Sequence, residues 1–444
     1  MLRPAQQRSP WRVQSRRRPV AELVIKGGRL LDATGERTGD IVVGSDGRIV
    51  AVGPDLSAPV VVDAGGCIVA PGLVDLHTHL REPGKEEAET IESGSRAAVL
   101  GGFTCVVAMP NTDPPIDDAA MVREVQGIGA RALCDVEVAG AITVGRRGER
   151  LAPMGEMADL GVRFFTDDGS GVQDDRLMRR AFEYASGLGV TIAQHCEVDA
   201  LASGGHMNEG AWSSRLGIPG IPAEAEELMV MRDIALARLT GARVHFQHLS
   251  TAGSVAMVRA AKAGGLAVSA EAAPHHFTLT DACLAGFDPV FKVNPPLRTD
   301  SDVAAVKAGL ADGAIDCIAT DHAPHAPHTK ELPIEEAPPG MLGLETALAL
   351  AITELGIDLS SVLARLSWQP AALAGLGGRH GGPLTEGAMA NIAVIDPTAT
   401  WTVDASKLAS RSRNTPYAGR TVRGRVRHTL VNGELVVSDG EALR

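Results

Sequence analysis

The sequence predicts an α/β protein in which a (β/α)8 TIM-like barrel is joined to a small β-sandwich domain built from both ends of the chain. Three observations lead to this prediction. The central part, about 71–375, alternates strand-like and helix-like stretches. Both ends consist of short β-branched runs broken by Gly, Asp-Gly or Asn-Gly. Ionisable residues follow the apolar part of most central strands, where a barrel carries its active site.

The two ends have the same texture. Residues 21–70 contain the runs AELVIKGGRLLD, GDIVVGSDGRIVAVG and APVVVDAGGCIVAPG, with a hairpin signal at SDGR. Residues 380–444 contain ANIAVIDP, WTVDA and RTVRGRVRHTLVNGELVVSDG, with an Asn-Gly turn. We therefore expect 21–70 and 380–444 to form one composite β-sandwich domain, and 71–379 to form the barrel.

The first 20 residues contain six Arg and no acidic residue. They lack the apolar stretch of a secretory signal. We expect residues 1–20 to be a basic disordered tail or the product of an over-long gene start. An organellar transit peptide is the alternative interpretation.

Eight strand-like runs can be read in the central part, and helical stretches such as EELMVMRDIALARLT and SVAMVRAAKAG separate most of them. Eight strands with helical connections over about 300 residues are typical of a (β/α)8 barrel. A doubly wound open sheet is the alternative fold. The strand-like runs are GLVDLHTH, FTCVVAMP, DVEVAGAITV, GVRFFTDD, VTIAQHCE, RVHFQHLS, LAVSAEAAPHH and DCIATDHAPH.

Composition narrows the function classes. Hydrophobic residues make up 45% of the 444 residues, which is enough for a packed core. The net charge of −12 argues against a nucleic-acid partner. No apolar run approaches the roughly 18 residues of a membrane span. The six Cys are scattered without a C-x-x-C pair, which is typical of reduced thiols in a cytoplasmic protein.

The first chemical motif is DLHTHLREPG, in which His77 and His79 lie two residues apart. Residues i and i+2 of a strand share a face, so both imidazoles can point at one metal ion. An isolated H-x-H is common and would be weak evidence by itself. Four further ionisable residues, however, end later strands of the predicted barrel: Asp168, His195, His248 and Asp321. Together these side chains would suffice for one or two zinc ions.

With DLHTHLREPG, TDDG, HC, HLST and TDHAPH in this order, the chain after residue 21 resembles the amidohydrolase superfamily and, within it, the bacterial type I dihydroorotases. The resemblance implies a first zinc held by His77, His79 and Asp321. It implies a second zinc held by His195 and His248, and a carboxylate from the fourth strand as the bridge.

The bridging ligand separates members of this superfamily. Hydantoinases and dihydropyrimidinases carry a carboxylated Lys there, whereas this chain offers only Arg163 and the pair Asp167 and Asp168. We assign the bridge to Asp168, because its spacing from His195 agrees with the family. Asp167 would then face away or orient a ligand.

The resemblance also implies a set of substrate contacts. Arg81 lies two residues past His79, and its planar guanidinium suits a substrate carboxylate. A salt bridge to a nearby Glu is the alternative role for Arg81, and Asn294 could cap a turn or His325 stabilise a loop. His275, His276 and His322 are expected to have supporting or structural roles, and 324–340 to cover the site. The expected substrate-binding residues are His79, Arg81, Asn111, Asn294, His325, Pro339 and Gly340.

The implied activity is the reversible cyclisation of N-carbamoyl-L-aspartate to L-dihydroorotate in pyrimidine biosynthesis, with Asp321 as the general acid and base. A hydantoinase or allantoinase is one alternative, which Arg81 and Asp168 disfavour. An inactive structural partner of aspartate transcarbamoylase is another, which the complete ligand set disfavours. The resemblance leaves room for a homo-oligomer and for a complex between an active enzyme and aspartate transcarbamoylase.

Overall fold

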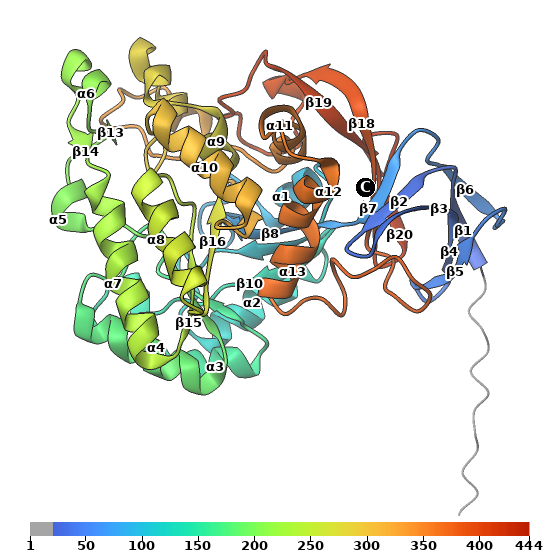
Figure 1. Cartoon of the computed structure of the whole chain (residues 1–444), viewed down its shortest axis with the longest axis horizontal. Coiled ribbons are helices and arrows are strands. Elements are labelled where there is room, and N and C mark those ends of the chain that lie inside the picture. The colour runs from blue at the N-terminus through green and yellow to red at the C-terminus, as the bar shows by residue number, and fades with distance from the viewer. Residues whose placement is uncertain (1–20, 444) are drawn as a thin grey trace, which may run out of the picture.

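The computed structural model describes residues 21–443. A helix-rich body and a β-rich body lie next to each other, and the β-rich body contains both the blue and the red ends of the described chain (Figure 1). The prediction for residues 1–20 lies outside the described residues.

The β-rich body consists of two sheets. The smaller sheet has the strand order β5 (Ile49–Gly53), β4 (Asp40–Gly44), β1 (Ala21–Lys26) and β6 (Val60–Asp63). The larger one has the order β21 (Glu441–Ala442), β20 (Glu434–Ser438), β19 (Thr421–Val431), β18 (Ile392–Thr402), β7 (Ile68–Pro71), β2 (Arg29–Asp32) and β3 (Gly35–Thr38).

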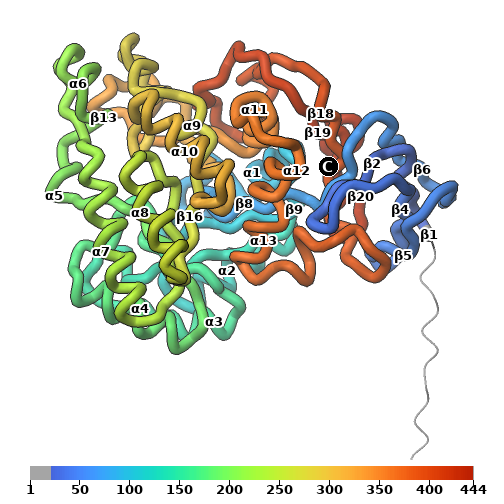
Figure 2. Tube along the Cα trace, viewed as in Figure 1, coloured from blue at the N-terminus to red at the C-terminus, as the bar shows by residue number. Residues whose placement is uncertain are grey.

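The two ends of the chain meet in the larger sheet. N-terminal β7 pairs with C-terminal β18 in antiparallel fashion and with β2 in parallel fashion, and the two ends run close together along the trace (Figure 2). Ile25 and Val43 of the smaller sheet share one apolar cluster with Val69, Val394 and Leu430 of the larger sheet. This packing of two sheets face to face is the expected β-sandwich.

Within residues 21–443, eight parallel strands of the helix-rich body belong to two larger sheets, apart from the short pair β13 (Met207–Asn208) and β14 (Gly220–Ile221). Three form the order β10-β9-β8 and five the order β11-β12-β15-β16-β17. The strands are β8 (Leu73–Thr78), β9 (Phe103–Ala108), β10 (Asp135–Val138), β11 (Phe164–Phe165), β12 (Thr191–Gln194), β15 (Arg243–Phe246), β16 (Val268–Ala272) and β17 (Cys317–Ile318).

Two parallel bridges close these strands into a ring. Gly140, after β10, bridges to Phe165 of β11, and Thr78 of β8 bridges to His322, after β17. An open doubly wound sheet would have two unpaired edges instead. The fold is therefore the predicted (β/α)8 barrel.

Helices surround the ring (Figure 1). Two of the longer helices begin with a capping box, formed by Thr90 and Ser93 at α1 and by Thr299 and Asp302 at α10. The longer helices are α1 (Ile91–Leu100), α2 (Ala119–Gly129), α4 (Asp175–Leu188), α7 (Glu224–Thr240), α8 (Ala252–Ala263), α10 (Asp300–Asp312) and α11 (Ala347–Glu354). No helix in the described residues is both long and apolar enough to cross a membrane.

Shorter elements connect the main ones. The short α-helices are α3 (Met154–Asp159), α5 (Asp199–Ala202), α6 (Ala211–Leu216), α9 (Pro274–Thr278), α12 (Leu359–Leu363) and α13 (Gln369–Leu373), and the short strands are β13 (Met207–Asn208) and β14 (Gly220–Ile221). Tighter or wider helical turns cover Val144–Arg146, Asp281–Gly286, Pro289–Phe291, Pro327–Lys330, Ala364–Trp368 and Ala405–Lys407. His275 and His276, read as the end of a strand, lie in α9, because the strand β16 ends before Pro274.

The barrel interior is filled mainly by small and branched side chains from alternate strand positions, including Val74, Leu76, Val107, Ala193 and Ala319. Beneath the mouth the filling turns polar, since His245, Ser269 and Glu271 are all buried there. All six Cys are free thiols, and all but Cys283 are buried, as the scattered spacing predicts.

Candidate metal centre

Six ionisable side chains from five strands meet at one mouth of the barrel. His77 lies in β8 and His79 directly after it. The others follow the ends of β11, β12, β15 and β17: Asp168, His195, His248 and Asp321. All six are buried.

Asp168 occupies the middle of this cluster. Its Oδ1 lies 3.4 Å from His77 Nε2, 3.5 Å from His195 Nδ1 and 3.6 Å from His248 Nε2. Its Oδ2 lies 3.5 Å from His79 Nε2. Two groups of ligand atoms, each within 4.8 Å of one another, therefore share this carboxylate: one with His77 and His79, the other with His195 and His248.

Asp321 borders the first of the two groups. Its Oδ1 lies 3.0 Å from His79 Nε2 and 3.5 Å from His77 Nε2. The other oxygen, Oδ2, lies 3.9 Å from His275 Nε2, which has no hydrogen-bond partner. Burial lowers the pKa of His275 well below its ordinary value, so this imidazole is neutral.

Two acceptors fix the orientation of the paired histidines. Glu271 Oε1 lies 2.7 Å from His77 Nδ1, and Asn111 Oδ1 lies 2.9 Å from His79 Nδ1. An acceptor at Nδ1 places the ring proton there and leaves the lone pair of Nε2 free. In both residues Nε2 is the atom that faces Asp168, and His77 Nε2 has no hydrogen-bond partner.

The electrostatics of the cluster favour a bound cation. Burial alone would raise the pKa of Asp168, but the charge on His77 and hydrogen bonds from His195 and His248 bring it well below its ordinary value. Burial lowers the pKa of His77, yet Asp168 and Glu271 outweigh this and raise it well above normal. The site thus demands positive charge, which a proton or a metal ion can supply. Nitrogen and carboxylate donors are suitable ligands for a divalent transition metal.

Asp167 points away from the cluster. Its Oδ1 accepts hydrogen bonds from the backbone N–H groups of Ile142 (2.8 Å) and Thr143 (3.0 Å), and its Oδ2 accepts one from the Thr143 hydroxyl. Burial raises its pKa to about 6 despite these bonds. Asp167 therefore holds the neighbouring loop, while Asp168 faces the histidines.

A cavity of about 180 Å³ opens directly above the cluster. The structure brings all seven residues expected to bind substrate to its wall: His79, Arg81, Asn111, Asn294, His325, Pro339 and Gly340.

Arg81 is the cation of this cavity. It is buried, and its Nε donates to the Pro324 carbonyl over 3.1 Å, which fixes the plane of the guanidinium. Burial lowers its pKa to about 10, so it keeps its charge at neutral pH. No salt bridge within the described residues neutralises Arg81, which leaves it available to an anion in the cavity.

The remaining wall residues are held by neighbours. Asn294 Nδ2 donates to both carboxylate oxygens of Glu197, at 3.1 and 3.0 Å. The Nε2 of His325 lies 2.8 Å from the Pro339 carbonyl, so the ring donates from that atom and ties the two ends of the 324–340 loop together. His322 does not line the cavity; its Nε2 lies 3.3 Å from Glu89 and its Nδ1 accepts from Gly343 N.

Comparison with known proteins identifies the family to which the chain belongs. A family model described as dihydro-orotase-like matches residues 66–254. A dihydroorotase of Pelotomaculum thermopropionicum is 48% identical over 94% of this chain and 99% of its own length. A dihydroorotase of Mycobacterium tuberculosis is 49% identical over 92% of this chain and 96% of its own length. The chain belongs to the dihydroorotase family.

Solved structures agree with this membership at the level of the fold. An L-hydantoinase (dihydropyrimidinase) from Arthrobacter aurescens superposes with a TM-score of 0.86 and 26% identity, covering 96% of this chain and 98% of that chain. A D-hydantoinase gives a TM-score of 0.83 at 24% identity. This member of the dihydroorotase family therefore shares the barrel and β-sandwich of the wider amidohydrolase group.

Two residues near the metal centre of this dihydroorotase-family chain, Arg146 and Glu271, were not among those predicted from the sequence. Arg146 donates to the backbone carbonyl of Asp168, and Glu271 supports His77. The signal for Glu271 was present, because a lone carboxylate inside the apolar strand VSAEA must have buried partners. Arg146 lies in a loop rich in Arg and Gly and carries no comparable signal.

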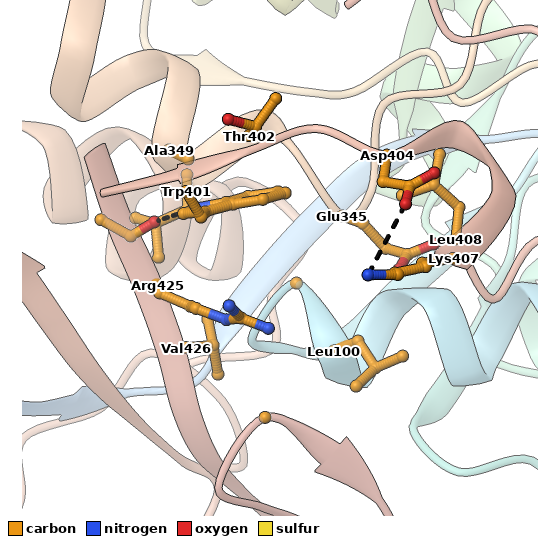
Figure 3. A pocket seen from close by; sticks show the side chains of 14 residues that line it. Leu100, Glu345, Ala349, Trp401, Thr402, Asp404, Lys407, Leu408, Arg425 and Val426 are labelled. Carbon is orange, nitrogen blue, oxygen red and sulfur yellow. Dashed lines mark hydrogen bonds and ion pairs between the residues drawn. The ribbon is translucent and has the colours of Figure 1, made fainter. Parts of the chain in front are cut away.

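A second cavity, of about 230 Å³, lies apart from the metal ligands (Figure 3). It is bordered by the end of α1, the start of α11 and the ends of β18 and β19, and its lining includes Leu100, Glu345, Trp401 and Arg425. Trp401 Nε1 donates to the Gly424 carbonyl over 2.9 Å. None of the residues predicted from the sequence to bind metal or substrate lines this cavity.

Proposed function

We propose that this protein is a zinc-dependent dihydroorotase that interconverts N-carbamoyl-L-aspartate and L-dihydroorotate plus water. The observation that carries the proposal is the shared carboxylate of Asp168 between two histidine pairs, beneath a cavity that contains the buried guanidinium of Arg81. Both substrates carry carboxylates, which a buried Arg without a salt bridge in the described residues would bind.

We assign His77, His79 and Asp321 to a first zinc and His195 and His248 to a second, with Asp168 between them. The two ligand groups that share Asp168 support two metal positions over one. Bound zinc would act as a Lewis acid toward the ring carbonyl and lower the pKa of a water molecule.

Asp321 would move the proton of the reaction. In the hydrolytic direction its carboxylate accepts a proton from the attacking water and delivers it to the ring nitrogen as the amide bond breaks. In the biosynthetic direction it takes the proton from the ureido nitrogen as that nitrogen attacks the side-chain carboxyl carbon, and returns this proton to the departing carboxyl oxygen, which leaves as water with one further proton from solvent. Contacts with His79 and His77 outweigh burial and lower the pKa of Asp321, so its carboxylate is ionised.

The chain's other residues would bind and orient the substrate. Arg81 and Asn111 line the cavity and would hold the carboxylate, and His325, Pro339 and Gly340 also line it. Asn294 would contact the ring. The 324–340 loop would limit access of bulk water, which strengthens electrostatic interactions within the site.

Several coarser expectations belong to the same proposal. We place the limits of the composite β-sandwich at 21–70 and 380–444 and those of the barrel at 71–379. The free thiols support a cytoplasmic location. A homo-oligomer and a complex with aspartate transcarbamoylase are compatible with the proposed activity.

Purified protein tests the function directly. Cyclisation of N-carbamoyl-L-aspartate and hydrolysis of L-dihydroorotate are assayed together with metal content, before and after chelation. We expect turnover that disappears on chelation and returns with zinc. Turnover of hydantoin or allantoin in preference to dihydroorotate would favour the sister enzymes instead.

A further inference from the structure

The connection between β18 and β19, residues 403–420, leaves the β-rich body and reaches the substrate cavity. Its Asn414 is buried and contacts the barrel residues Ala323, His325 and Gly340, which line that cavity. Asn414 itself does not line the cavity. The contact joins a segment of the C-terminal sheet to the wall of the proposed active site.

The side chain of Asn414 is fully engaged. Its Nδ2 donates to the Ala323 carbonyl (2.9 Å) and the Gly340 carbonyl (3.1 Å), and its Oδ1 accepts from His325 N (3.2 Å). Because two partners are carbonyl oxygens and one is an N–H group, only one orientation of the amide satisfies all three. A carboxylate of the same size could not replace it.

These bonds join two separate stretches of the cavity wall. Ala323 and His325 follow the last barrel strand, whereas Gly340 ends the 324–340 loop. The stretches are in close contact: a Cβ atom on Gly340 would lie 2.7 Å from His325 Nε2, and Gly340 has a φ of +143° that disfavours other residues. Asn414 thus adds three side-chain bonds to two wall segments that are also joined by the hydrogen bond from Ala323 N to the Met341 carbonyl and by the contact of His325 with Pro339.

The connection is itself anchored before it reaches Asn414. Glu345 accepts a hydrogen bond from Ala409 N over 2.8 Å, and Glu89 accepts one from Arg411 N over 3.1 Å. Ser412 Oγ donates to the Ala88 carbonyl over 2.7 Å. Figure 3 shows the start of the connection, with Asp404, Lys407 and Leu408 beside Glu345. Because these hydrogen bonds hold the backbone of the connection, the side chain of Asn414 has a fixed position relative to the barrel.

We propose that Asn414 is a positioning residue that holds the two walls of the substrate cavity in register and thereby sets the affinity for substrate. The proposal rests on the assignment of this cavity to dihydroorotase substrates. Its role is indirect, through His325 and Gly340, and it takes no part in the proton transfer. The C-terminal sheet would then contribute to specificity as well as to stability.

Two variants test the proposal. Asn414→Ala removes all three bonds, and Asn414→Asp places a carboxylate oxygen against two carbonyls at unchanged size. We expect KM for dihydroorotate to rise on the order of tenfold or more in both, at least as strongly in the Asp variant, with a much smaller change in kcat and with wild-type zinc content. If Asn414 only filled space, the Ala variant, which removes more atoms, would raise KM more than the Asp variant does.

Ser412→Ala is the matched control, because it loses one anchoring hydrogen bond of the connection, to the Ala88 carbonyl, while the bonds to Glu345 and Glu89 and all three side-chain bonds of Asn414 remain. Its KM should equal that of the wild type even if its melting temperature falls. Equal rises in KM for the control and the Asn414 variants would overturn the proposal, as would wild-type KM in both Asn414 variants.

Amide hydrogen exchange supplies a readout that needs no turnover. In the wild type Asn414 Oδ1 accepts a hydrogen bond from the His325 amide, and Asn414→Ala, which removes this acceptor, should exchange the amide faster while the Asp167-bonded amides of Ile142 and Thr143 remain protected. If the His325 amide exchanges at the wild-type rate in Asn414→Ala, the proposed positioning role of Asn414 is refuted. Failure of the wild type to turn over dihydroorotate would instead refute the proposed function, since the exchange result stands apart from it.

Discussion

At the scale of single residues, Asp168 is the side chain that faces both pairs of histidines. One carboxylate faces four imidazoles within 3.6 Å, and its depressed pKa leaves it ionised. Metal ligands must be deprotonated to bind. A buried anion of this kind, whose carboxylate forms no salt bridge with Lys or Arg within residues 21–443, is stable only if cations occupy its surroundings.

Asp321→Asn separates metal binding from proton transfer. The amide oxygen can still face the cluster, but the side chain can no longer accept a proton. We expect turnover to fall by about 10²- to 10⁴-fold while zinc content largely persists, as measured by elemental analysis and steady-state kinetics on the same preparation. Wild-type rates in this variant would remove Asp321 from the acid–base role.

Glu271→Gln tests the support of His77. The carboxylate contacts His77 Nδ1 at 2.7 Å and His245 Nε2 at 3.0 Å, and contacts of this type raise the basicity of a ligand. We expect zinc affinity to weaken by roughly 10- to 100-fold, measured by competition with a chromophoric chelator.

Ser269→Ala is the control for Glu271. It removes the hydroxyl 2.8 Å from His245 Nδ1 but leaves the contact between Glu271 and His77 intact. Its zinc affinity should stay close to that of the wild type. Equal affinities for the wild type and Glu271→Gln would show that His77 needs no such support.

At the scale of elements, the β18–β19 connection is held by carboxylates that lie in the barrel. Glu345 precedes α11 and accepts from Ala409 N. Burial raises the pKa of Glu345 to about 7, although these backbone hydrogen bonds oppose the rise. Its protonated form therefore favours the folded state.

The pH dependence follows from this raised pKa. Because the folded pKa exceeds the ordinary value, the contribution of Glu345 to stability is complete below about pH 4.5 and is lost as the pH rises through 7. Glu345→Gln stays neutral throughout, so its stability relative to the wild type should increase between pH 5 and pH 8. Each unit of pKa difference corresponds to about 1.4 kcal/mol of unfolding free energy.

Urea unfolding at several pH values measures this difference. Asp358→Asn is a suitable comparison, since hydrogen bonds from Ser361 lower the pKa of that exposed helix cap, and its effect on stability should stay constant between pH 5 and pH 8 and change only below about pH 4. A stability difference for Glu345→Gln that does not change with pH would contradict the assignment.

At the scale of the whole molecule, sequence patterns predict the parts of the fold that depend on residues close to one another in the sequence. Alternation of strand and helix indicates the barrel, and the shared texture of the two ends indicates a composite sandwich. In each closing bridge one partner lies beyond the end of a regular strand, Gly140 after β10 and His322 after β17. Sequence patterns could therefore raise the doubly wound fold as an alternative, but they could not locate the closure.

The residues of the site likewise divide into those that sequence patterns predict and those that they do not. His77 and His79 are readable because a strand puts both on one face, and their partners because barrel strands end at one mouth. The bonds of Asn414 are not readable, since 91 and 74 residues separate it from Ala323 and Gly340. Contacts of such range depend on the assembled fold and leave no local pattern.

A crystal structure with anomalous scattering measured across the zinc absorption edge tests the central claim most directly. We predict zinc peaks on both sides of Asp168, about 2.0–2.2 Å from its oxygens and from the nitrogens of the adjoining histidines. Absence of a peak within ligand reach of Asp168 in active, zinc-containing protein would contradict the account.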